Sequence, residues 1–135
     1  MKIISLIASG TEIVHSLGNA KDLVGISHEC DYPISIKSLP ICSEPRFDSD
    51  GRSIEVDTQI KSLLQSALSV YRVREDVISK LSPDIIITQS QCDVCAVNIK
   101  DVRSALDSIL GIQPEIISLE PNNLNDVWCD IKDIA

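Results

Sequence analysis

Basic residues, aromatic residues and long apolar runs are all scarce in this sequence of 135 residues. Lys and Arg together number 12, against 20 Asp and Glu, so the formal net charge is −8. A surface that neutralises nucleic-acid phosphates needs the opposite balance, which excludes a nucleic-acid partner. No apolar run approaches the roughly 18 residues that a membrane-spanning helix needs. Because 44% of the residues are hydrophobic, the sequence still predicts one folded domain with its own core.

Familiar catalytic motifs are missing as well. The sequence contains no Gly-x-Ser-x-Gly elbow, no P-loop and no Gly-x-Gly-x-x-Gly loop. We therefore expect a protein that is not an enzyme and that carries no covalently bound cofactor and no resident metal. The apolar stretch at residues 3–6 is too short for a signal peptide. This predicts a cytoplasmic protein as written, or a periplasmic or extracellular one if a leader was removed.

Two polar clusters stand out against this background, and each follows an apolar run. Residues 28–33 read His-Glu-Cys-Asp-Tyr-Pro and come directly after the run around Val24. Residues 88–95 read Thr-Gln-Ser-Gln-Cys-Asp-Val-Cys and come after three consecutive isoleucines. A buried strand that ends in such a cluster presents it at the edge of a sheet, where a ligand can be met. The equivalent positions of the two clusters suggest one shared site.

The pattern of apolar residues alternates between strands and helices. Buried strands are predicted over residues 3–6, 23–27, 84–88 and 115–119, with a further short strand near 39–42. Amphipathic helices are predicted between them, one of them starting with Ser9 as N-cap and Glu12 completing a capping box. The other helices are expected over residues 56–68, 74–81 and 98–110, and from residue 121 onward.

This alternation predicts an α/β fold, with an open and mostly parallel sheet of about four strands and helices on both faces. Residues 1–120 would form this Rossmann-like lobe, and residues 121–135 would begin a further helix. Ligands of such sheets bind beyond the carboxyl ends of the strands, which is where both clusters would lie. The candidate ligand-binding residues there are His28, Cys30, Tyr32, Gln89, Cys92 and Cys95.

The pair Cys92-x-x-Cys95 has several interpretations. The five cysteines are an odd number, so they cannot all be paired within the chain. The spacing suits a dithiol redox motif or half of a zinc site, for which Cys30 and His28 are the available further ligands. Two reduced thiols packed in a loop, or a disulfide, are the plainer interpretations.

The motifs taken together resemble the start of class III substrate-binding proteins, which serve ABC importers of cobalamin and iron siderophores. The resemblance is strongest to a cobalamin-binding-like branch and covers nearly the whole chain. The residues that carry it include Ser9-x-Thr11-Glu12-Ile13, the run at 28–33, Tyr71-Arg72-Val73 and the run at 88–96.

The resemblance implies two α/β lobes that hold a ligand between them and are joined by a long helix. The chain would then be the N-terminal lobe plus the start of that helix, with the second lobe absent. Cobalamin or an iron chelate would be the transported ligand, and Glu75 and Asp76 would dock onto an ABC permease. The alternative function is a cytosolic redox or metal-handling protein that uses Cys92 and Cys95, and a third is an interaction domain without a small ligand.

Overall fold

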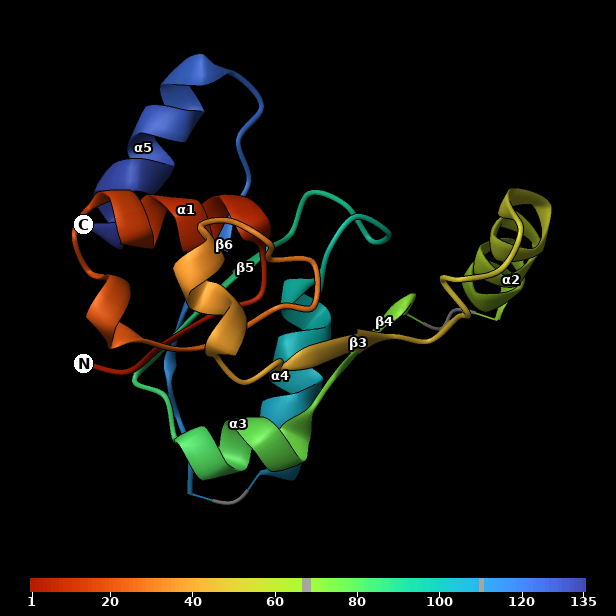
Figure 1. The fold of residues 1–135 in the computed structure, drawn as a ribbon, viewed down its shortest axis with the longest axis horizontal. Helices are drawn as coiled ribbons and strands as arrows, with labels where there is room; N and C mark the ends of the chain where they lie inside the picture. The colour runs from red at the N-terminus through yellow and green to blue at the C-terminus, as the bar shows by residue number, and fades with distance from the viewer. Residues whose placement is uncertain (67–68, 110) are drawn as a thin grey trace.

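The computed structural model describes residues 1–66, 69–109 and 111–135 and has the predicted α/β architecture (Figure 1). Its strands are β1 (Ile3–Ser5), β2 (Leu23–Ile26), β3 (Ser43–Pro45), β4 (Tyr71–Val73), β5 (Ile85–Gln89) and β6 (Glu115–Leu119). Its α-helices are α1 (Ala8–Ser16), α2 (Ser53–Gln65), α3 (Glu75–Leu81), α4 (Ile99–Ser108) and α5 (Leu124–Ile134), and two short 3-10 helices are η1 (Ala20–Asp22) and η2 (Ile34–Ser38).

Four strands form one parallel sheet in the order β2-β1-β5-β6. The central pair is in simple register, with Ile4 opposite Ile86 and Ser5 opposite Ile87. Because all four strands point the same way, the segments that follow them emerge at one edge of the sheet. The predicted sheet of four parallel strands is confirmed.

Strands β1, β5 and β6 alternate their side chains between two hydrophobic cores. Ile4 and Ile86 pack on the face that also holds residues of α3 and α4. Ile3 and Ile87 pack on the opposite face, together with Val14 of α1 and Ile134 of α5. The arrangement in Figure 1 agrees, with α1 and α5 on one side of the sheet and α3 and α4 on the other. The predicted cover of helices on both faces is therefore confirmed.

Two local predictions were wrong. The first helix begins at Ala8 with Ile7 as its N-cap and without a side-chain cap, so Ser9 lies inside the helix. The chain can turn into the helix this early because β1 already ends at Ser5. The short strand expected near residues 39–42 is instead β3, starting at Ser43, and only Ile41 forms an isolated bridge to β2.

Strands β3 and β4, with helix α2 between them in the chain, form a unit separate from the main sheet. These two strands form an antiparallel ribbon, and Figure 1 shows α2 at its far end. The helix expected over residues 56–68 is present as α2, although none of its residues is buried. Ala67 and Leu68 of that prediction lie outside the described residues, as does Leu110 of the helix expected over 98–110. The described part of that second helix, α4, ends at Ser108.

Within the described ranges, none of the helices combines the length and the apolar character that crossing a bilayer requires.

Candidate functional site

A cavity of about 720 Å³ lies at the edge of the sheet where the parallel strands end. This volume is within the range of small-molecule sites. Its wall comes from the segments that follow β1, β2, β5 and β6 and from one face of α5. The lining residues are Leu6, Ile7, Ala8, Ser9, Ile13, Glu29, Gln89, Gln91, Cys92, Cys95, Ala96, Leu119, Pro121, Val127 and Asp130.

The first turn of α1 forms one side of this cavity because the helix approaches the sheet closely. A Cβ atom on Gly10 would lie 2.8 Å from the Cγ2 atom of Ile87, so only glycine fits at this position without displacing that side chain. Ala8 and Ser9, at the start of the helix, line the cavity. No side chain among the described residues caps this helix start. The first backbone N–H groups of α1 are therefore without intrahelical acceptors beside the cavity.

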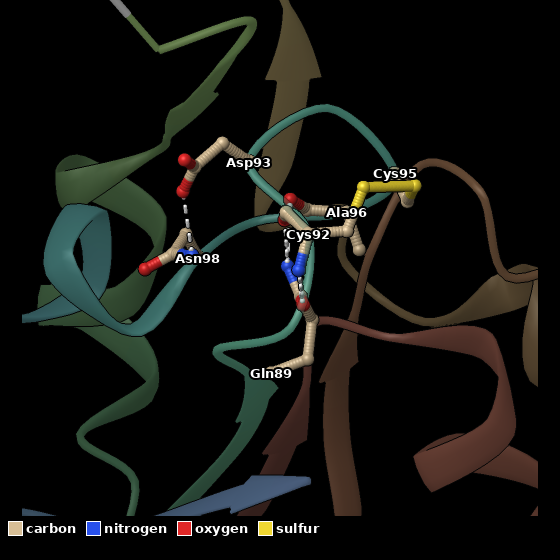
Figure 2. The surroundings of a disulfide bond; sticks show 6 residues. All are labelled: Gln89, Cys92, Asp93, Cys95, Ala96 and Asn98. Carbon is tan, nitrogen blue, oxygen red and sulfur yellow. Dashed lines mark hydrogen bonds between the residues drawn. A yellow bond between two sulfur atoms is a disulfide. The ribbon is translucent and has the colours of Figure 1, made fainter. Parts of the chain in front are cut away.

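The loop after β5 forms another wall, and the buried side chain of Gln89 organises it (Figure 2). Gln89 Oε1 accepts a hydrogen bond from the backbone N–H of Cys92 at 2.7 Å. Gln89 Nε2 donates to the backbone carbonyls of Cys92 and Ala96, at 2.5 and 3.3 Å. At the far end of the loop, Asn98 donates to Asp93 and caps α4. One amide side chain thus holds the loop against the end of its own strand.

Cys92 and Cys95 form a disulfide at the surface of this loop, and both line the cavity. The sequence left several interpretations of this pair open, and the structure shows the disulfide. In the described ranges, no three His, Cys, Asp or Glu side chains gather closely enough to hold a metal ion. Cys30, the candidate third ligand of a zinc site, is a separate free thiol.

The loop after β2 contributes only Glu29 to the cavity, because its other polar side chains turn elsewhere. Cys30 is 6% exposed and packs in the core beneath α1. Its Sγ atom shares a hydrogen bond of 3.1 Å with Thr11 Oγ1. Burial raises the pKa of the Cys30 thiol, which favours the protonated and unreactive form. Tyr32 is 62% exposed and lies outside the cavity lining.

His28 is half-buried and supports the loop from below. Its Nδ1 atom lies 2.8 Å from Ser43 Oγ, and that hydroxyl in turn donates to Ser27. Burial lowers the pKa of His28 and outweighs the attraction of Glu29 and Glu44. Glu29 Oε1 is 3.2 Å from Nε2, but in an orientation that makes no hydrogen bond.

Two acidic residues line the cavity, and neither was among the site residues predicted from the sequence. Glu29 lies within the first polar cluster, whereas Asp130 belongs to α5. Burial raises the pKa of Asp130, and the neighbouring carboxylates of Asp133 and Asp126 raise it further. The signal that could have identified Asp130 is its position three residues after Val127, on the same face of a helix.

The predicted permease-docking residues lie at the start of α3 and do not line the cavity. Glu75 and Asp76 are both exposed in the first helical turn. Ser108 Oγ donates a hydrogen bond of 2.6 Å to Glu75, and Arg74 lies 3.8 Å from Asp76.

No protein-family model and no curated protein matches this chain. Solved structures do match it. A periplasmic heme-binding protein from Pseudomonas aeruginosa superposes with a TM-score of 0.64 at 19% identity, covering 98% of this chain and 36% of that protein. The periplasmic vitamin B12 binding protein BtuF of Vibrio cholerae gives 0.60 at 20% identity, covering 98% and 39%. The heme-binding protein HutB of the same organism gives 0.62 at 16% identity, covering 100% and 40%.

These likenesses establish the class of fold. The chain has the α/β fold found in periplasmic proteins that bind heme and vitamin B12, as the resemblance in the sequence predicted. It spans between 36% and 40% of the length of these three structures. The likeness is to one part of a larger molecule.

Proposed function

We propose that this chain is the N-terminal lobe of the substrate-binding component of an ABC-type importer, and that it binds cobalamin or a related metal chelate. The observation that carries the proposal is the cavity at the carboxyl edge of a sheet with this fold. Residues 1–120 would form the lobe, and α5 would begin the helix that leads to a second lobe. No catalytic step is part of this function.

Three of the candidate residues would contact the ligand directly. Gln89, Cys92 and Cys95 line the cavity. Tyr32 is exposed and could reach a ligand that extends beyond the cavity, while His28 and Cys30 would support the loop that carries Glu29. Glu75 and Asp76 are accessible for docking onto a permease. The disulfide supports a periplasmic or extracellular location, because disulfides persist in oxidising compartments.

A titration of the purified chain with cyanocobalamin and with ferric heme, followed by the visible spectra of these ligands, tests the proposal. We expect saturable binding of at least one of them. Val127→Trp fills the cavity from α5 and should weaken that binding by about tenfold or more. Leu124→Trp is the matched control, because Leu124 is 67% exposed on the same helix and does not line the cavity. Absence of saturable binding to either ligand would overturn the proposed function.

A further inference from the structure

The charged residues that line the cavity are all acidic. Glu29 and Asp130 both line it, and no lysine or arginine is among its lining residues in the part of the chain that the structure describes. The two carboxyl groups come from opposite edges of the sheet. Glu29 follows the edge strand β2, and Asp130 lies on the helix that follows the other edge strand, β6. The lining of the cavity therefore includes one acidic residue from each of these edges.

Among the described residues that line the cavity, no basic side chain neutralises either carboxyl group. Glu29 is next to His28, whose burial disfavours the charged imidazolium. Around Asp130, the charged groups that act on its carboxyl are further carboxylates, those of Asp133 and Asp126, and a hydrogen bond from the backbone of Glu120 offsets only part of their effect on its pKa. The positive end of α1 contributes only about half an elementary charge. An anionic ligand group would be repelled here, and the partial burial of the site strengthens the repulsion.

The same cavity also presents hydrogen-bond donors. The uncapped first turn of α1, at Ala8 and Ser9, offers backbone N–H groups. The carboxyl groups of Glu29 and Asp130 offer acceptors. A primary carboxamide satisfies both kinds of partner, because its carbonyl oxygen accepts and its NH₂ group donates. A carboxylate can use only the N–H groups and leaves the acidic side chains facing a like charge.

We propose that this cavity selects metal chelates with carboxamides at their edge over chelates with carboxylates, and that Glu29 and Asp130 determine this specificity. The inference rests on the proposed function and narrows its ligand class. Amide-bearing corrinoids would be preferred, and porphyrins that carry free propionates would be disfavoured.

The test uses one chelate in two forms, so that only the edge groups differ. Ferric heme is compared with its bis-carboxamide derivative, in which both propionates are primary amides, and cyanocobalamin is measured alongside. For the unmodified chain we expect the bis-carboxamide to bind about tenfold more tightly than heme. In Glu29→Gln/Asp130→Asn this ratio should fall towards one, mainly because heme binds more tightly.

Asp107→Asn/Glu115→Gln is the matched control, because it removes the same net charge from exposed residues outside the cavity. It should keep the preference of the unmodified chain, and circular dichroism confirms that each variant is folded. Equal affinity for heme and its bis-carboxamide, or a preference that survives in Glu29→Gln/Asp130→Asn, would overturn the inference while leaving the proposed function intact. If none of the three chelates binds, the proposed function fails and the inference fails with it.

Discussion

The two polar loops look equivalent in the sequence, yet the structure uses them in opposite ways. The loop after β5 lines the cavity with its disulfide and with Gln91 and is held by one internal amide, that of Gln89. The loop after β2 turns His28 towards Ser43 and Cys30 towards Thr11, and leaves only Glu29 for the cavity.

The path of the chain after each loop explains this difference. After the β2 loop, the chain passes through η2 and returns beside its own strand, where Ile41 bridges Ile26. The returning segment therefore provides hydrogen-bonding partners for polar side chains of that loop. After the β5 loop, the chain enters α4 directly, and the loop must satisfy its own backbone groups. The β5 loop therefore stays at the cavity wall, where Ser90 and Gln91 bond to the segment after β6, which also lines the cavity.

The largest effect is expected for Gln89→Leu. This substitution leaves the backbone N–H of Cys92 and the carbonyl of Ala96 without their partner in a buried position. We expect the free energy of unfolding to fall by about 3 kcal/mol, measured by urea denaturation. Gln91→Leu is the control, because Gln91 is exposed and donates only to the carbonyl of Pro121, so its cost should stay below about 0.5 kcal/mol. Equal stability of the two variants would show that Gln89 does not hold the loop.

A smaller effect is expected when the disulfide is removed in Cys92→Ser/Cys95→Ser. The bond closes a loop of only four residues, for which the chain-entropy estimate is about 2 kcal/mol of stability. A reducing dithiol should lower the urea midpoint of the unmodified chain and leave that of the double variant unchanged. Ligand affinity should change little, because serine is close in size to cysteine and Gln89 still holds the loop.

Cys30→Ala is the comparison from the other loop, since it removes a buried thiol outside the cavity. Relative to the unmodified chain, Cys30→Ala should lower the free energy of unfolding by the same amount with and without the dithiol. A dithiol effect that persists in Cys92→Ser/Cys95→Ser would contradict the assignment of the redox-sensitive bond to the β5 loop.

The sheet could be predicted from the sequence because its signal is local. Consecutive β-branched residues such as Ile85, Ile86 and Ile87 favour a strand buried on both faces, whatever the rest of the chain does. The helix expected over residues 98–110 was predictable for the same reason, since Asn98 caps it by bonding to the first turn of its own helix. The start of α1 was wrong because the end of β1, and not a capping side chain, sets it.

The cavity was only partly predictable, because the direction of a loop side chain depends on distant partners. The orientation of His28 is set by Ser43, 15 residues away, and that of Cys30 by Thr11, 19 residues away. No periodicity encodes such contacts. Asp130 enters the site only because α5 packs beside α1, which is a property of the tertiary structure.

The smallest expected effect is a dependence of the free energy of unfolding on pH that arises from the half-buried imidazole of His28. Burial lowers the pKa of His28 in the folded chain below its ordinary value of 6.5. As the pH falls through 6.5, the unfolded chain takes up a proton first, so the stability contributed by the neutral ring is lost between 6.5 and the lower pKa of the folded state. The loss should appear as a decrease in the free energy of unfolding between about pH 7.5 and pH 5.5, above the range where ordinary carboxylates titrate.

His28→Gln should show a smaller decrease over this range, because its side chain can still bond to Ser43 but takes up no proton. His15→Gln, at the other histidine of the chain, is measured in parallel. If His28→Gln loses stability as steeply as the unmodified chain, His28 is not the neutral support of the β2 loop. The two polar loops would then be more alike than their contacts indicate, since His28 could carry charge beside Glu29 at the edge of the cavity.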